Sequence, residues 1–341
     1  MITFRRLFNI RATPIAALLL SLVCAPLSMA ATLKIATLSP EGSGWMKVLR
    51  KHGKAIEART DGAVRMKFYP GGVMGDDKAI LRKMRVGQLH GAVITSGALV
   101  QQYPDISLYN LPMMFRNDAE VDHVRAVLDE QLMQGLREKK FVGFGFAEVG
   151  FAYPMTQSPT ASVEQMRQRK VWTPDNDIGS LRGFEAFDIS PIPLPISDVL
   201  AGLQTGLVDS VASPPIATIA LQWHTQVTYG LDLPLIYVYG LFAMAEKPFE
   251  KLTAEQQIIV AEELRQAVHT ADLDARRDHL SAKTALGKQG IQWQQPDPQQ
   301  LDKWLTLARE ARGRLVANGY VSELMYKNAV KLLADFRATS D

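Results

Sequence analysis

Cysteine is almost absent from this sequence, which has one, Cys24, in 341 residues. A single cysteine cannot close a disulfide within the chain, and Cys24 lies in a segment that we predict is removed. The mature protein would then have neither a disulfide nor a thiol nucleophile. At roughly 311 residues it is long enough to bury one large core or two medium ones without covalent staples.

Long apolar runs are absent as well. The apolar segment 14–23 follows three arginines and spans roughly ten residues, about half of what a membrane-spanning helix needs. Small residues at 28–30 follow it, so we predict a signal peptide, residues 1–30, cleaved between Ala30 and Ala31, and a periplasmic mature chain. A lipoprotein anchor on Cys24 is the alternative, which Val23 disfavours.

An excess of charge of one sign is missing from the mature chain. The leader carries three of the 38 basic residues and none of the 35 acidic ones, so the net charge of +3 belongs to the leader. The neutral mature chain has no basic footprint for nucleic acid, and we predict no nucleic-acid partner.

Motifs of catalysis are lacking too. The six histidines are scattered without an HExxH pair, and no G-x-S-x-G turn is present. The glycines at 143, 145 and 150 are wrongly spaced for a dinucleotide-binding turn. Asp175 and Asp177 lack further ligands at calcium-loop spacing and are interpreted as a structural turn. We predict a binding protein that is not an enzyme and uses no cofactor or metal.

The mature chain instead alternates strand and helix patterns. Strands are expected at 33–38, 64–69 and 92–95, and helices at 44–59 and from Asp76 to Gly87. Such alternation predicts an α/β fold with a mainly parallel sheet.

Residues 191–215 contain the most informative pattern. A helix is expected after Ser197, whose side chain would cap it, and Gly206 would end it. The apolar residues of 207–212 predict a buried parallel strand. The loop 213–215 would then lie where open α/β sheets place their ligands.

The C-terminal part is expected to be helical. From Ala254 to Leu286 the chain has neither Gly nor Pro, and Thr253 with Gln256 forms a capping box. Asp297 and Pro298 begin another helix, and a last one would run to about Arg337.

Several segments resemble a known family. The turn at 69–77, the link at 86–92, the segment Leu111–Phe115 and the stretch 191–215 follow the order and spacing of solute-binding proteins of TRAP (tripartite ATP-independent periplasmic) transporters, the DctP-like family. The resemblance covers residues 32 to about 270. It implies a bilobal fold of two α/β lobes with central sheets, hinge strands and a long helix of the C-terminal half across both lobes.

The resemblance also implies how the chain divides. Residues 31–149 with about 238–280 would form lobe I, and residues 150–237 with about 281–341 would form lobe II. The protein would capture a small organic solute, such as an organic acid, between the lobes. It would deliver the solute to the small and large subunits of a TRAP permease, acting as a monomer. A ligand-presenting sensor component and, less favoured, a periplasmic enzyme on the same scaffold are the alternatives.

Three positions depart from the family's pattern. Relatives that bind carboxylates have arginines that clamp the substrate where this chain has Trp172 and Ala152, and an asparagine where it has Ser213. Tryptophan can stack on a flat group, but it cannot form a two-pronged contact with a carboxylate. Trp172 is therefore interpreted as facing the ligand, with packing in the core as the alternative.

Strand ends and the crossover between the lobes supply the other candidates. Glu148, without an arginine nearby, would favour a neutral or cationic ligand. The predicted ligand-binding residues are Trp172, Ser213, Asn176, Ser96, Trp45, Glu148 and Phe151.

Overall fold

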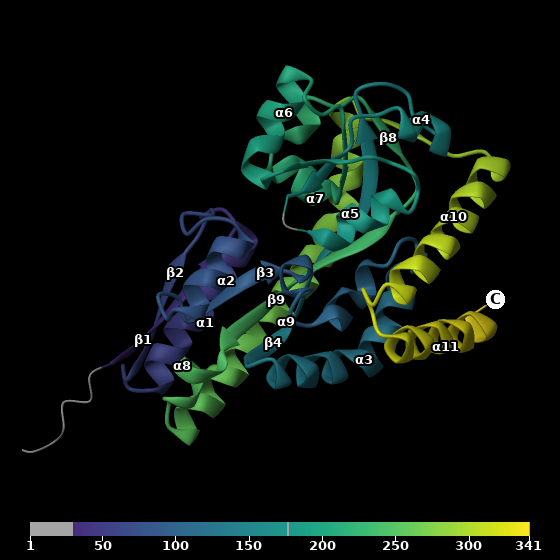
Figure 1. The fold of residues 1–341 in the computed structure, drawn as a ribbon. Helices are drawn as coiled ribbons and strands as arrows, with labels where there is room; N and C mark the ends of the chain where they lie inside the picture. Colours follow the sequence, from purple (N-terminus) through teal and green to yellow (C-terminus); the bar gives the residue numbers. More distant parts are fainter. Residues whose placement is uncertain (1–29, 176, 341) are drawn as a thin grey trace, which may run out of the picture.

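The computed structural model describes residues 30–175 and 177–340. The chain forms two lobes, connected by two long strands that cross from one to the other (Figure 1). These strands, β4 (Phe141–Thr156) and β9 (Ile236–Ala245), pair antiparallel along most of their length. The predicted leader, residues 1–30, lies outside the described residues except for Ala30.

The first lobe contains a sheet of the order β2-β1-β3-β9-β4. Its first three strands are β1 (Ala31–Thr37), β2 (Val64–Tyr69) and β3 (Gly91–Thr95). β1 pairs parallel with both β2 and β3, whereas β9 pairs antiparallel with β3. The prediction of a mainly parallel sheet is therefore wrong: the sheet is mixed because the chain returns from the second lobe antiparallel to β3.

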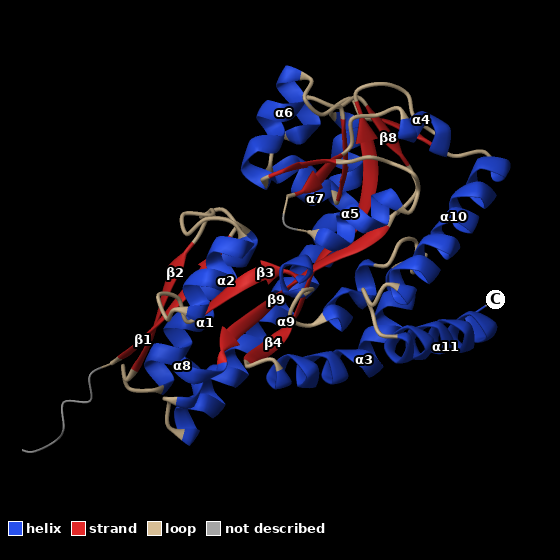
Figure 2. Ribbon diagram, viewed as in Figure 1, coloured by secondary structure: helices blue, strands red, loops and turns tan. Residues whose placement is uncertain are grey.

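Helices cover the first lobe on both faces (Figure 2). The predicted helix α1 (Gly44–Arg59) is confirmed, and so is the start of α2 (Asp77–Arg85), where Asp76 accepts a bond from the amide of Ala79. The remaining elements of this lobe are the 3₁₀ helices η1 (Ser96–Leu99) and η2 (Pro104–Asn110) and the helices α3 (Asp118–Glu138) and α8 (Glu246–Glu250).

The second lobe is built around the end of β4. There β4 pairs antiparallel with β7 (Ser210–Ser213) and β8 (Tyr229–Leu231), and β10 (Gln292–Gln294) adds to the edge. β5 (Trp172–Pro174) and β6 (Ile192–Leu194) form a separate parallel pair. The helices are α4 (Val163–Arg167), α5 (Ile178–Glu185), α6 (Val199–Thr205) and α7 (Pro215–Ala220), with 3₁₀ turns η3 (Ile196–Asp198) and η4 (Trp223–Thr225).

Two expectations for residues 191–215 are wrong. Ser197 does not cap α6, because a 3₁₀ turn precedes the helix and the Ser197 hydroxyl bonds to the side chain of Asp198. The predicted strand at 207–212 begins only at Ser210 and pairs antiparallel with β4, while Leu207 is exposed. Gly206 does end α6, in the left-handed conformation that glycine adopts without strain.

The long C-terminal helix is confirmed as α9 (Ala254–Lys288), 35 residues with the predicted capping box at Thr253 and Gln256. It contacts α1 and β4 in the first lobe and α7 in the second, so it crosses both. The predicted start of α10 (Pro298–Ala317) is also confirmed, with Asp297 as its cap. Within residues 30–175 and 177–340, none of the helices has both the length and the apolar character that a membrane crossing requires.

The last helix, α11 (Glu323–Ser340), lies along α3 of the first lobe (Figure 1). Its residues Met325, Ala329 and Leu333 belong to the same buried cluster as Val121 and Leu128 of α3. The predicted division assigned residues 281–341 to lobe II. Because of this packing, we propose that α11 belongs with lobe I and that the rest of the division stands as predicted.

A bulge in β4 marks the crossing. The register between β4 and β9 shifts between Glu148 and Gly150, and Gly150 has a φ of +104°. Behind it lies His279 of α9: a Cβ at Gly150 would be 1.9 Å from the Cε1 atom of His279. Burial lowers the pKa of His279, so the ring is neutral where it packs on the bulge. Glycine is therefore required at 150 by both conformation and close approach.

We expect Gly150→Ala to destabilise the protein by about 3 kcal/mol or more, because the added methyl group clashes with the ring and the backbone angle is strained. Urea unfolding measures the change. Gly313→Ala on α10 is the control, since nothing lies within 4 Å of a Cβ there and its φ is ordinary. It should be neutral or stabilise by up to about 1 kcal/mol. Equal effects of the two changes would contradict the prediction.

Candidate functional site

The two lobes touch where strand ends from each of them meet. In the first lobe, β3 ends at Thr95 and leads directly into η1, which contains Ser96 and Gly97. In the second lobe, β5 ends at Pro174, and Asp177 immediately precedes α5. The Asp177 carboxylate lies against Gly97, where an added Cβ would be 2.7 Å from the Asp177 Cγ atom. The candidate site is this junction.

On the first-lobe side, a buried carboxylate supports the end of β3. Asp77, which is 8 % exposed, accepts hydrogen bonds through Oδ2 from the Thr95 amide (3.1 Å) and hydroxyl (2.6 Å). Its Oδ1 atom is buried without a hydrogen-bond partner. Burial raises the pKa of Asp77 to about 6; the Thr95 bonds oppose the shift, and the charges of Asp76 and Asp177 add to it.

Carboxylates of the second lobe face those of the first. Burial raises the pKa of Asp175, and the nearby charge of Asp76 raises it further, while Lys78 lowers it. The electrostatic influence of Asp76 on Asp175, and of Asp177 on Asp77, shows that acids of both lobes lie close together. Carboxylates of the two lobes therefore act electrostatically on one another at this rim.

Ser96 connects the junction to the hinge. Its hydroxyl donates to the Asn110 side-chain oxygen (2.5 Å), and the Asn110 amide donates to the backbone oxygen of Tyr237 in β9 (2.8 Å). Ser96 is buried in this arrangement. A role of Ser96 in binding a ligand stays a prediction, and its present role is to hold η1 on the crossing strand.

Trp172 lies in the core of the second lobe. Its side chain is 6 % exposed and packs edge to face on Trp223, with ring centroids 5.0 Å apart. The indole N–H donates to the backbone oxygen of Leu194 in β6 (2.9 Å). This bond uses the only polar group of the side chain, so contact with a ligand, which stays a prediction, is left to the ring.

The other two departures from the family pattern lie on neighbouring strands. Ala152 of β4 is fully buried, and Ser213 of β7 is nearly so. Ser213 pairs with Tyr153, the residue after Ala152, so the two substituted positions are adjacent across the ladder. The Ser213 hydroxyl contacts the backbone oxygen of Pro214 at 3.3 Å. Ser213 as a ligand contact stays a prediction.

Two aromatic candidates lie apart from one another. Trp45 is half-buried and packs against the apolar cluster of α1, β1 and α9 in the first lobe. Phe151 is buried at the crossing and packs edge to face on Tyr237, with centroids 5.4 Å apart. Their roles in binding stay predictions, and Asn176 lies outside the described residues.

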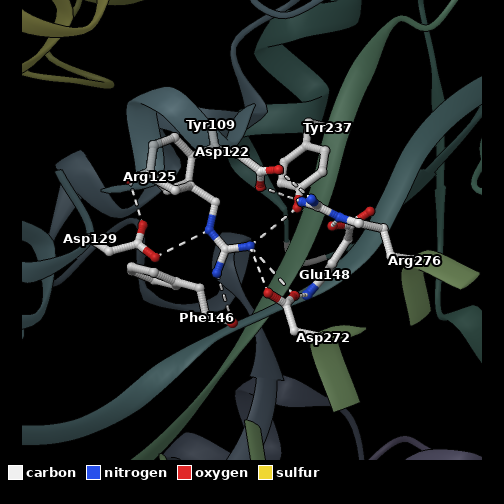
Figure 3. A network of polar contacts seen from close by, with 9 residues as sticks. All are labelled: Tyr109, Asp122, Arg125, Asp129, Phe146, Glu148, Tyr237, Asp272 and Arg276. Atoms are coloured by element: carbon white, nitrogen blue, oxygen red, sulfur yellow. Dashed lines mark hydrogen bonds and ion pairs between the residues drawn. The ribbon is translucent and has the colours of Figure 1, made fainter. Parts of the chain in front are cut away.

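Glu148 belongs to a network of charges at the crossing strands (Figure 3). It is 1 % exposed, and Arg276 of α9 donates to its Oε2 atom (2.9 Å) and to both carboxylate oxygens of Asp122. Burial raises the pKa of Glu148 and the arginine opposes the shift. The premise that Glu148 has no arginine nearby is therefore wrong, and with it the inference of a neutral or cationic ligand from this residue.

A second arginine completes this network. Arg125 of α3 binds Asp129 and Asp272, and it donates to the backbone oxygen of Phe146 in β4. Asp272 of α9 also accepts from the amide of Glu148 (2.7 Å). Arg125, Asp129 and Asp272 were not among the predicted site residues. Only the i, i+4 spacing of Arg125 and Asp129 was visible in the sequence, since the carboxylates of the network that pair across elements are more than 100 positions from their partners.

The hollows in the described part of the chain include two that differ in size and lining. One, of about 50 Å³, lies among α5, β7, β9 and α10 and is lined by side chains that include Ser180, Phe184 and Trp304. It is too small for a sugar-sized solute. The other, of about 560 Å³, lies at the far end of the first lobe and has basic lining residues such as Arg85, Lys139 and Lys251. In residues 30–175 and 177–340 no cluster of three or more His, Cys, Asp or Glu side chains is arranged to hold a metal ion.

Comparison with known proteins identifies relatives over most of the chain. The sequence model of the family described as bacterial extracellular solute-binding protein, family 7 (DctP), matches residues 35–317. The sialic acid-binding periplasmic protein SiaP of Vibrio cholerae is 23% identical over 279 residues, which are 80% of this chain and 85% of the relative.

Solved structures share the fold. The sugar acid binding protein DctPAm of Advenella mimigardefordensis, in complex with galactonate, superimposes with a TM-score of 0.82 at 15% identity and covers 90% of this chain and 98% of its own. A TRAP periplasmic solute-binding protein of Xanthobacter autotrophicus with bound β-D-galacturonate gives 0.79 at 18% identity, covering 89% of this chain and 99% of its own.

We expect Arg276→Met to destabilise the protein by about 3 kcal/mol, because Glu148 is then left buried without its partner. Urea unfolding gives the change. The control is Arg50→Met, which breaks the exposed pair with Glu41, whose side chains are 47% and 57% exposed; it should cost less than about 1 kcal/mol. A loss no greater than that of the control would show that the network does not stabilise the crossing.

Asp77 should make stability depend on pH. Since its pKa in the folded chain is raised, to about 6, the folded state holds the proton more tightly than the unfolded chain. The contribution of Asp77 to stability is therefore largest below about pH 4 and is lost as the pH rises through 6. Relative to Asp77→Asn, which cannot ionise, the wild type should lose roughly 2 kcal/mol between pH 4 and pH 7. Urea unfolding across this range would contradict the prediction if the two curves ran parallel.

Proposed function

The chain belongs to the bacterial extracellular solute-binding proteins of family 7, the solute-binding components of TRAP transporters, and we propose that it passes its solute to the small and large subunits of a TRAP permease. Members of this family bind small-molecule solutes and work with TRAP membrane components; they are not enzymes. That this chain catalyses no reaction is part of our proposal.

The observation that supports this function best is the junction of the lobes at strand ends. Gly97 and Asp177 come from opposite lobes, and the only long strands that connect the lobes in the described part of the chain are β4 and β9. A rotation about these strands would separate the two sides and admit a solute, and closure would then enclose it. The closed form would be the one that docks on the permease.

The proposal also covers the export of the protein and the number of chains in its active form. Proteins of this family act in the periplasm. We propose that the leader is cleaved between Ala30 and Ala31 and that the mature chain acts as a monomer, since one chain supplies both sides of the junction.

The solute is proposed to differ from simple dicarboxylates. Relatives are named for sialic acid and for 2,3-diketo-L-gulonate, and related structures hold galactonate and galacturonate, all of them organic acids. This chain has Trp172 and Ala152 where carboxylate-binding relatives have arginines. A small organic acid that is flatter, larger or less charged than succinate or malate suits such a site better. Each carboxylate of a dicarboxylate would need a buried arginine to form a two-pronged contact with it, and these arginines are replaced here.

The test begins with the solute that the protein retains. Mature protein purified from expressing cells without denaturation is analysed by native mass spectrometry, and the retained small molecule is identified. Calorimetry then compares this molecule with succinate, malate, D-galactonate and D-glucuronate. We expect tight binding of the retained molecule and, for succinate and malate, dissociation constants at least about a hundredfold larger, since a bidentate charge-assisted contact contributes a few kcal/mol. Micromolar binding of succinate or malate would overturn the proposed solute class.

The variant Trp172→Phe, measured in the same calorimetric experiment, decides whether Trp172 contacts the solute or only packs in the core. If the indole ring contacts the solute, the dissociation constant should rise at least about fivefold, because a smaller ring stacks less surface. Thermal unfolding of the solute-free variant measures the loss of the bond to Leu194 separately. An unchanged dissociation constant would assign Trp172 to the core alone.

A further inference from the structure

The carboxylate of Asp177 is held in one position. Asp177 precedes α5, and its Oδ1 and Oδ2 atoms accept hydrogen bonds from the amide (3.0 Å) and hydroxyl (2.5 Å) of Ser180, while its backbone oxygen accepts from the amide of Leu181. This is the geometry of a helix N-cap. The side chain therefore moves with α5 and the second lobe as a unit.

Gly97, opposite it, is held just as firmly in the first lobe. The preceding residue, Ser96, is bonded through Asn110 to the backbone of Tyr237 in β9. A Cβ at Gly97 would lie 2.7 Å from the Asp177 Cγ atom and 2.8 Å from each carboxylate oxygen, closer than real Cβ contacts come. The φ of Gly97 lies outside the left-handed region, so its backbone would accept another residue. The three atoms nearest to such a Cβ all belong to Asp177, so its approach requires a glycine here.

The contact between Gly97 and Asp177 is one of close packing. Asp177 acts electrostatically on Asp77, a carboxylate of like charge that supports the neighbouring Thr95. The free energy that favours closure is supplied by the differential affinity of the solute for the closed form. The position at which the lobes come to rest is then decided by the surface that Asp177 meets.

We propose that Gly97 and Asp177 form the closing contact of the lobes: the capped carboxylate of α5 seats on the side-chain-free surface of η1 only in the closed form and positions the lobes around the solute. This inference rests on the proposed function and adds two positioning residues to it. Neither residue needs to touch the solute.

A double-mutant cycle tests the contact. The chains are wild type, Gly97→Ala, Asp177→Ser, and both changes together. Serine is the matched replacement at 177, because it is a good N-cap and keeps a bond to Ser180 while leaving room for a methyl group at 97. Gly44→Ala in the same lobe is the control, since a Cβ there meets nothing within 4 Å.

The readout is the distance between the lobes. The only cysteine of the chain, Cys24, lies in the leader, so a chain that starts at Ala31 and carries Val73→Cys and Gln204→Cys can be labelled at those two sites alone. Val73 is 69% exposed in the first lobe, and Gln204 is exposed on α6 of the second. Pulsed electron-spin resonance records the distance distribution of each chain, first without solute. It is then repeated with the small-molecule fraction released from natively purified wild-type protein.

We expect Gly97→Ala to lower the closed-to-open ratio at least about tenfold against the wild type and the Gly44→Ala control. In the Asp177→Ser background, Gly97→Ala should change this ratio less than about twofold, because the methyl group no longer meets a carboxylate. If Gly97→Ala lowers the thermal unfolding temperature enough to unfold the chain, Asp177→Glu replaces it, since the added methylene pushes the carboxylate into Gly97 and should open the lobes in the same way.

The outcomes separate this contact from the proposed function. An unchanged distribution in a folded Gly97→Ala chain, or an equal opening in the Asp177→Ser background, overturns the closing contact. The deciding comparison is made under the condition that closes the wild-type lobes, which is the released small-molecule fraction or, if none is retained, the organic acid of the calorimetric panel that shortens the wild-type distance. Absence of a retained molecule, with no closure in response to any organic acid of the calorimetric panel, would instead count against solute capture.

Discussion

The fold depends on charge neutralisation where the two long strands cross. Arg125 from α3 and Arg276 from α9 together engage carboxylates that include Glu148, which is almost fully buried in β4. A buried ion pair of this kind contributes little net stability over apolar packing, but losing one partner is costly. The network therefore favours one position of α3 and α9 on the crossing strands. This is the position in which the two arginines meet their carboxylate partners. The long helix α9 is in this way attached to the hinge.

The attachment of α9 to the crossing strands determines where the two lobes meet. Directly beyond the network, β4 bulges at Gly150 over the neutral ring of His279, and β9 holds η1 through Asn110. The end of β3 and the start of α5 are thus brought to the same place from opposite lobes. Carboxylates of both lobes lie at this place and act electrostatically on one another.

The three residues that depart from the family pattern also have structural roles in the second lobe. Trp172 packs on Trp223 and ties β5 to β6 through Leu194, and Ala152 and Ser213 are adjacent on β4 and β7. An arginine at either Trp172 or Ala152 would place a charge among buried apolar groups unless a ligand carboxylate accompanied it. The chain has apolar packing at these positions, which agrees with a solute held by fewer charged contacts.

The sequence by itself determined the parts of this protein whose signals are local. The caps at Asp76, Thr253 and Asp297 and the stop at Gly206 depend on bonds within a few residues, so the helices and the family pattern could be read from it. Tertiary structure decided the rest. The antiparallel return of β9, the pairing of Glu148 with Arg276, the bond from Trp172 to Leu194 and the contact of Gly97 with Asp177 all join residues far apart along the chain. Such contacts depend on how the lobes pack, because propensity and periodicity describe only one element at a time.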